Sequence, residues 1–166
     1  GLDYTPVYGA ASKWDGGSVG CGSLIKKSFS VNKIKKIALP GDEPRIAVRT
    51  DLDQFVFIST HGDLNDSKRI QGANIINNEL DYIRKPVLAG DLNDCHRWGN
   101  GGIAFPIYMQ KFEIVSDTKG NTVWNGVHGN EGADQGLIDY VLFHDYGNSD
   151  IQVQQTHIVR TIEING

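Results

Sequence analysis

Four polar side chains follow or interrupt apolar runs of the sequence, and their types suit phosphate chemistry. His61 follows FVFIST, Asp91 and Asn93 follow PVLAG, and Asp139 lies inside GLIDYVLF. Hydrolysis of a phosphodiester needs an oxygen-ligated divalent cation, donors to the nonbridging oxygens and a base for the attacking water. Asp, Asn and His side chains can supply those functions. The sequence therefore favours a metal-assisted phosphoester hydrolase.

The spacing suggests how these side chains would share the work. Asp91 and Asn93 are two residues apart at a predicted strand end, so both can face one small volume and hold hydrated Mg²⁺ or the attacking water. His61 can donate to a phosphoryl oxygen. Asp139 lies within an apolar run, where an unpaired buried carboxylate would be costly, so we expect it to have a partner or a role.

His61 and Asp91 also have a plain structural interpretation. A single His after a strand is often a surface residue or one that is hydrogen-bonded to the framework. An Asp in GDLND can close an Asx turn or cap the following segment. The local sequence alone leaves these alternatives open.

The elements that would position the four residues follow from the spacing of apolar side chains. Gly-rich GGSVGCGS and the alternating SFSVNKIKKIALPG indicate a hairpin or meander. RIAVRTDL and FVFIST predict two adjacent antiparallel strands. Helical spacing then runs from Asp66 to about Arg84, with Asp66 or Ser67 as the N-cap.

The second half of the chain begins with PVLAGD, a short apolar run typical of a buried strand, so a strand, helix, strand unit is expected. Residues 95–132 are rich in Gly and Asn and predict long loops, with a short helix near IYMQKF and an extended EIVSDT. LIDYVLF and IQVQQTHIVRTIEI predict two more strands. The result is a mixed sheet with helices packed against it.

Amino-acid composition and net charge argue against some classes of protein. The 166 residues are 39% hydrophobic and 22% charged, which is typical of a globular chain, and no apolar run is long enough to span a membrane. The formal net charge of −4 argues against tight nonspecific binding of DNA, and we interpret the early lysines of the chain as solvated strand faces. Cys21 and Cys95 are expected to be unpaired thiols.

The order strand-STH, amphipathic helix, KPVLAGDLN, long loops and LIDYV resembles the endonuclease/exonuclease/phosphatase superfamily, whose fold is that of pancreatic deoxyribonuclease. Members carry T-H, G-D-x-N and I-D-Y motifs in this order. SVGCGSLI and DEPR are similar to a Gly-rich segment and an E-P-R segment of the family. The likeness runs from about Gly16 to the C-terminus, and PVLAGDLN is its most specific part.

The resemblance implies an α+β fold, the layered α/β/β/α sandwich of the deoxyribonuclease type. Members also place an Asn on their first strand, a Glu in a Q-E motif and a final S-D-H, and none of these three is present in this sequence. We therefore expect residues 1–166 to form a single, truncated and incomplete domain of this type, which by itself could be inactive.

The resemblance also implies roles for individual residues. His61 would contact the scissile phosphate, and Asp91 would position or deprotonate the nucleophilic water and serve the metal, Mg²⁺ or Mn²⁺. Asn93 would orient the water or bind phosphate, and Asp139 would orient a second, C-terminal His. We expect attack of metal-assisted water on phosphorus in one step, without a covalent intermediate.

Substrate and partners are less defined by the motifs. Arg45 is a candidate phosphate ligand, although it could instead pair with Glu43 or Asp42. Trp98 and Trp124 lie in predicted loops and could either stack on the substrate or pack within the protein. The family cleaves nucleic acids, phospholipids and sugar phosphates, so any of these phosphoesters could be the substrate. We expect a monomer.

Two alternatives were compared with this hypothesis. THGD and GDLND have a superficial likeness to calcineurin-like metallophosphoesterases, but that family needs a G-N-H motif, and Gly99-Asn100 is followed by Gly101. The other alternative is a non-catalytic module of the same fold that binds phosphorylated ligands or a protein partner. Turnover of a generic phosphodiester with Mg²⁺ separates this module from an enzyme.

Overall fold

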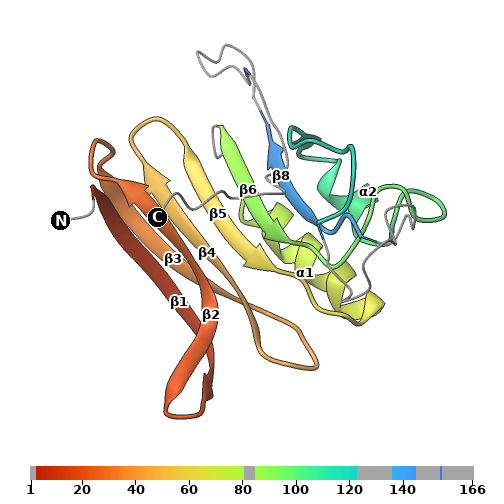
Figure 1. The fold of residues 1–166 in the computed structure, drawn as a ribbon, viewed down its shortest axis with the longest axis horizontal. Helices are drawn as coiled ribbons and strands as arrows, with labels where there is room; N and C mark the ends of the chain where they lie inside the picture. The colour runs from red at the N-terminus through yellow and green to blue at the C-terminus, as the bar shows by residue number, and fades with distance from the viewer. Residues whose placement is uncertain (1–2, 81–84, 123–135, 145–153, 155–166) are drawn as a thin grey trace, which may run out of the picture.

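Two sheets and two helices make up the described part of the computed structural model, which comprises residues 3–80, 85–122, 136–144 and 154. The strands and helices are β1 (Tyr4–Trp14), β2 (Gly17–Lys26), β3 (Val31–Leu39), β4 (Arg45–Leu52), β5 (Val56–His61), α1 (Asp66–Asn78), β6 (Pro86–Asp91), α2 (Phe105–Tyr108), β7 (Glu113–Ile114) and β8 (Asp139–Phe143). β1 and β2 form a hairpin, and the other strands form one sheet in the order β3-β4-β5-β6-β8-β7 (Figure 1).

The connections in the large sheet bring three strand ends together. β3, β4 and β5 are antiparallel neighbours, as the sequence predicted for β4 and β5. β5 and β6 are parallel, and such a pair needs a crossover, which α1 provides. β8 then runs antiparallel to β6. The ends of β5 and β6 therefore lie beside the beginning of β8.

Helix α1 begins and ends at different residues from those expected. The N-cap is Asn65, whose side chain accepts a hydrogen bond from the Lys68 backbone N–H at 3.3 Å, so the prediction of Asp66 or Ser67 as N-cap was wrong. An N-cap needs an extended backbone, and Asn65 has φ −83° and ψ 124°. The helix ends at Asn78, before the expected Arg84, which lies outside the described residues.

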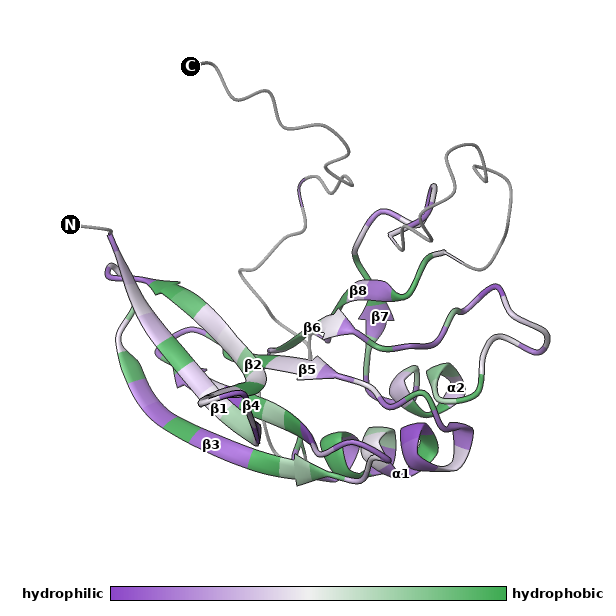
Figure 2. Cartoon of the chain, turned by 60° about the horizontal axis from the view of Figure 1, so that its bottom comes forward, coloured by the Kyte–Doolittle hydropathy of each residue, from purple (hydrophilic) through white to green (hydrophobic). Residues whose placement is uncertain are grey.

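The two faces of the large sheet bury different cores. On one face, Ile58 of β5 and Leu88 of β6 belong to a cluster with Ala73 and Ile76 of α1 and with Phe105 of α2. On the other face, the hairpin packs against β4, and the buried residues there are Val7, Ile25, Ile46, Val48 and Leu52. Helices, large sheet and hairpin form three successive layers (Figure 2), which confirms the prediction of a layered α+β fold.

The hairpin pairs differently from the expectation. β2 pairs with the preceding β1, and β2 and β3 belong to different sheets. The turn between β1 and β2 is Asp15-Gly16, and both residues have positive φ, 41° and 75°. Two-residue hairpin turns favour this Asp-Gly sequence because it adopts the required twist. This local signal was present in the sequence and identifies the true hairpin.

Several smaller predictions also have an outcome. PVLAGD forms β6, a short helix lies beside IYMQKF at Phe105–Tyr108, and LIDYVLF contains β8. Neither Cys21 nor Cys95 forms a disulfide with another described residue, as expected. The predicted strand within IQVQQTHIVRTIEI lies outside the described residues. None of the helices described is long and apolar enough to cross a membrane.

Candidate active site

Three of the predicted site residues form one row across the sheet. In the strand register, His61 at the end of β5 lies opposite Asp91 at the end of β6, and Asp91 lies opposite Asp139 at the start of β8. Residues opposite one another on neighbouring strands point to the same face, with Cα atoms about 5 Å apart. His61 Nε2 lies 3.5 Å from Asp91 Oδ2. Residues distant in sequence therefore share one small region.

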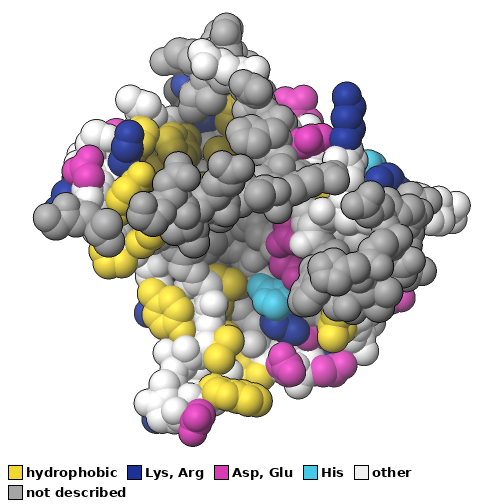
Figure 3. Space-filling view, viewed as in Figure 1, with side chains coloured by type: hydrophobic (Ala, Val, Ile, Leu, Met, Phe, Trp, Pro, Cys, Tyr) yellow, Lys and Arg dark blue, Asp and Glu magenta, His cyan; other side chains and the backbone are white. Residues whose placement is uncertain are grey.

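The row is accessible from solvent. The side chains of His61 and Asp91 are 43% and 29% exposed. In the space-filling view a histidine lies between acidic and basic side chains on the surface (Figure 3). A phosphate group could thus reach both residues without a change in the fold.

Asn93 joins the same region through its backbone and its side chain. Its backbone N–H donates to Asp91 Oδ1 at 2.8 Å, and its Nδ2 donates to the Gly62 carbonyl at 2.9 Å. Its φ of 48° is in the left-handed region, which Asn tolerates better than most residues. Asp91 therefore closes an Asx turn, as the structural interpretation held. Among the described residues, no hydrogen bond to Asn93 Oδ1 is seen, so this oxygen can accept one.

The backbones approach too closely for side chains at two glycines, one at the end of β6 and one in the loop after β5. A Cβ on Gly62 would lie 2.4 Å from the Leu92 carbonyl oxygen, and one on Gly90 would lie 1.9 Å from the Thr60 carbonyl oxygen. Gly62 N–H also donates to the Asp91 carbonyl at 2.8 Å. Gly62 thus lets the loop after β5 pass directly over the end of β6.

The surroundings of Asp91 favour its protonated form. Burial raises the pKa of Asp91, and the negative charge of Asp139 raises it further. The hydrogen bond from Asn93 and the charges of His61 and Arg45 lower the pKa and offset only part of this rise. A carboxylate whose pKa is raised is a stronger base than an ordinary one when it is ionised.

Asp139 is exposed. Its place in an apolar run had suggested a buried carboxylate, and that premise was wrong. The strand alternates, so that Tyr140 and Leu142 face the core while Asp139 and Val141 point outward. Asp139 thus needs no buried partner, and its backbone N–H donates to Thr122 Oγ1 at 3.0 Å.

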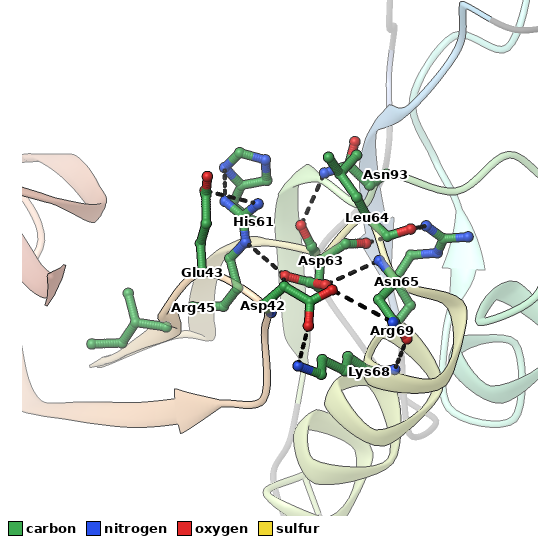
Figure 4. Close-up of polar contacts among 12 residues, drawn as sticks. Asp42, Glu43, Arg45, His61, Asp63, Leu64, Asn65, Lys68, Arg69 and Asn93 are labelled. Atoms are coloured by element: carbon green, nitrogen blue, oxygen red, sulfur yellow. Dashed lines mark hydrogen bonds and ion pairs between the residues drawn. The ribbon is translucent and has the colours of Figure 1, made fainter.

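Arg45 lies next to the row, held by a residue that the sequence reasoning missed. Arg45 Nη1 is 3.4 Å from His61 Nδ1, and Arg45 Nε is 3.4 Å from Asp63 Oδ2 (Figure 4). Glu43 Oε2 lies 3.5 Å from Arg45 Nη2, and this ion pair is one of the alternatives that the sequence suggested for Arg45. The only sequence signal for Asp63 is its place two residues after His61.

The remaining candidates lie apart from the row or cannot be placed. Trp98 is partly buried and packs against the main core, which favours the packing interpretation for this residue. Trp124 lies outside the described residues. Asp94, also missed, is fully buried and accepts hydrogen bonds from the backbone N–H groups of Cys95 and of residues 103–105. It fixes the loop that follows the site.

The donors for a metal ion are few in the part of the chain described here. Within it, no group of three or more His, Cys, Asp or Glu residues could hold an ion. Asp91 and Asp139 provide two carboxylates side by side. That number fits Mg²⁺, which takes one or two protein carboxylates and completes its shell with water and substrate phosphate, and it does not fit a closed structural site.

Comparison with known proteins finds similarity in structure alone. No family model and no curated protein matches the chain. A functionally unknown conserved protein from Enterococcus faecalis V583 is 19% identical, with a TM-score of 0.69 over 84% of this chain and 64% of its own. An endonuclease/exonuclease/phosphatase family protein from Bacteroides thetaiotaomicron is 14% identical, with a TM-score of 0.65 over 85% and 60%.

A third similar structure is the 3' phosphatase NExo from Neisseria bound to product DNA hairpin, 14% identical, with a TM-score of 0.57 over 85% of this chain and 66% of its own. The chain thus spans less than two thirds of each of these three proteins. At such identities the likeness concerns the fold, and the fold is that of the endonuclease/exonuclease/phosphatase proteins, as the motifs implied.

Proposed function

We propose that this protein hydrolyses phosphoester bonds, with Asp91 activating water and His61 binding the phosphate, in a reaction that depends on Mg²⁺. One observation carries the proposal, namely the register that aligns His61, Asp91 and Asp139 on three neighbouring strands. Support also comes from the fold, which the chain shares with a 3' phosphatase and with endonuclease/exonuclease/phosphatase family proteins.

The chain's own residues suggest a simple course for the reaction. His61 donates a hydrogen bond to a nonbridging phosphoryl oxygen. Asp91 takes a proton from a water molecule whose oxygen forms the new bond to phosphorus, while the bond from phosphorus to the leaving oxygen breaks. The leaving oxygen takes up a proton from solvent. Asn93 Oδ1 is free to accept a hydrogen bond from the same water and so to orient it.

The cation would be held by Asp91, with Asp139 beside it. Repulsion from Asp139 contributes to the raised pKa of Asp91, and a cation would relieve that repulsion. When bound, Mg²⁺, or Mn²⁺ in its place, supplies positive charge that stabilises the phosphoryl oxygens. Arg45 could add to this charge, although its side chain is only 13% exposed.

Turnover of bis(p-nitrophenyl) phosphate with Mg²⁺ and with EDTA tests this proposal. Asp91→Asn should lower kcat by about 10²–10⁴-fold, the usual contribution of a general base. Asp53→Asn is the matched control, because Asp53 is exposed in the turn at the opposite end of β5. Wild-type rates for Asp91→Asn, or hydrolysis that EDTA leaves unchanged, would contradict the mechanism.

The second candidate function is the non-catalytic module, because binding a phosphate needs only donors such as His61 and its neighbour Arg45. In that case the row formed by His61, Asp91 and Asp139 would bind a phosphorylated ligand without cleaving it. Calorimetric titration with p-nitrophenyl phosphate, alone and with Mg²⁺, separates the two functions. Binding that needs no Mg²⁺, together with no release of p-nitrophenol, would favour the module over the enzyme.

A further inference from the structure

Arg45 connects a buried carboxylate to the ring of His61. Its Nε lies 3.4 Å from Asp63 Oδ2, and its Nη1 lies 3.4 Å from His61 Nδ1 (Figure 4). The Arg45 and Asp63 side chains are 13% and 2% exposed, so their contact is largely shielded from solvent, whereas His61 lies at the surface. The guanidinium plane thus meets an acceptor on one edge and the inner ring nitrogen of His61 on another.

Asp63 is a fixed part of the framework. Its side chain is 2% exposed and accepts hydrogen bonds from the backbone N–H groups of Asn65, at 3.0 Å, and Asp42, at 3.1 Å. Burial alone would raise the pKa of Asp63, but these bonds and Arg45 outweigh it and lower the pKa below its ordinary value. Asp63 is therefore ionised at neutral pH and gives Arg45 a permanent partner.

The loop that carries Asp63 is held in place from helix α1. Arg69 Nη1 donates to the carbonyl oxygens of Asp63, at 3.2 Å, and Leu64, at 2.8 Å. Asn65, which bonds Asp63, is also the N-cap of α1. The position of the Asp63 carboxylate is thus set by the helix, independently of the site.

A hydrogen bond from Arg45 is compatible with only one of the two neutral tautomers of the His61 ring. A guanidinium has donors only and stays protonated, so its partner nitrogen Nδ1 must accept. The ring proton then resides on Nε2, the nitrogen that lies 3.5 Å from Asp91 Oδ2 and faces the site. The other tautomer would place an N–H against the N–H of Arg45.

We propose that Asp63, acting through Arg45, is a positioning residue that fixes the neutral ring of His61 as the Nε2–H tautomer. The donor needed for a phosphoryl oxygen is thereby ready before substrate arrives, so that no free energy is lost in selecting it. The catalytic consequence rests on the proposed phosphoester hydrolysis. The tautomer itself is a property of the free protein.

Nitrogen NMR of the ring tests this inference directly. In uniformly ¹⁵N-labelled protein, at a pH where the rings are neutral, long-range ¹H–¹⁵N spectra distinguish protonated from unprotonated ring nitrogens. His61→Gln identifies the His61 signals among the five histidines. We expect the wild type to show Nε2–H, and a His61 ring that is protonated on Nδ1 would overturn the inference.

Variants establish whether Arg45 and Asp63 impose the tautomer. Arg45→Gln should change the tautomer ratio by about tenfold, the effect of one charged hydrogen bond, because an amide can accept as well as donate. Asp63→Asn should act in the same direction, and Arg45→Gln keeps the test valid if that buried change prevents folding. Glu43→Gln is the matched control, since Glu43 contacts Arg45 from solvent with a side chain that is 78% exposed. An unchanged ratio in Arg45→Gln would refute the inference.

Kinetics separate this inference from the proposed function. Arg45→Gln should lower kcat more than it raises KM, because the misplaced ring proton weakens a contact that strengthens in the transition state. If the wild type has no turnover, the proposed function fails while the NMR result still decides the tautomer. If turnover is present and the tautomer does not respond to Arg45→Gln, only the positioning role fails.

Discussion

The close approach at Gly62 gives the sharpest test of how the loops hold the site. Gly62→Ala would place a Cβ 2.4 Å from the Leu92 carbonyl oxygen, whereas real Cβ contacts are essentially never shorter than 3.0 Å. The two backbones must therefore separate by roughly half an ångström, because neither side of the contact is a flexible side chain. Leu92 stands between Asp91 and Asn93, so the shift acts directly on two site residues.

The size of the effect follows from this displacement. Overpacking that moves the backbone costs about 1–3 kcal/mol of stability. A misplacement of about 1 Å can lower a rate by about 10²-fold, so half that distance should lower kcat about tenfold or more. Urea unfolding and turnover of bis(p-nitrophenyl) phosphate measure the two effects on the same preparation.

Gly72→Ala provides the matched control with the opposite expected sign. Gly72 lies within α1, and a Cβ there would meet nothing within 4 Å. Replacing a helical Gly with Ala should stabilise the protein by up to about 1 kcal/mol and leave the rate unchanged. If Gly62→Ala keeps wild-type stability and kcat, the loops do not constrain the site as described.

Three further predictions concern the carboxylates. Asp91→Asn should raise the free energy of unfolding at neutral pH. Folding raises the pKa of Asp91, so the charged form destabilises the folded state and stability falls as the pH rises through that pKa. Urea unfolding that shows a loss of stability in the variant would contradict this. Asp63→Asn should destabilise the protein most near neutral pH, and the loss should shrink as the pH falls from about 4. The reason is that Asp63, whose pKa is lowered in the fold, stabilises the protein only while it is ionised. Denaturation curves of both proteins across this pH range measure the loss. Asp94→Ala should cost about 3 kcal/mol or more, since it leaves buried backbone N–H groups without an acceptor, and a Tm equal to wild type would refute this.

Much of the site could be predicted because strand ends are visible in the sequence. The apolar runs before His61 and Asp91 identify two strands, and the helix between them implies that the strands are parallel, so both ends lie at the same edge of the sheet. The exposure of Asp139 could also have been predicted. Side chains of a strand alternate between its two faces, and Tyr140 and Leu142 face the core, so Asp139 points the other way.

Other features depend on contacts that local sequence does not reveal. Asp63 and Asp94 are common residue types in turn-rich segments, and only the fold shows that backbone N–H groups converge on them. The choice of Asn65 as N-cap likewise depends on the loop geometry that Asp63 imposes. The Asp15-Gly16 turn was visible in the sequence, but β1, the strand before it, was not predicted. This strand contains Gly, Ala and Ser residues, which have a weak preference for strands.

A crystal structure of the protein with Mg²⁺ and a monophosphate product would show directly whether His61 and Asp91 form a phosphate site. Phosphate oxygens should lie within hydrogen-bonding distance of His61 Nε2, with Asp91 and Asn93 facing the phosphorus. Phosphate bound elsewhere, with His61 and Asp91 making no contact to it, would show that these residues do not form a phosphate site.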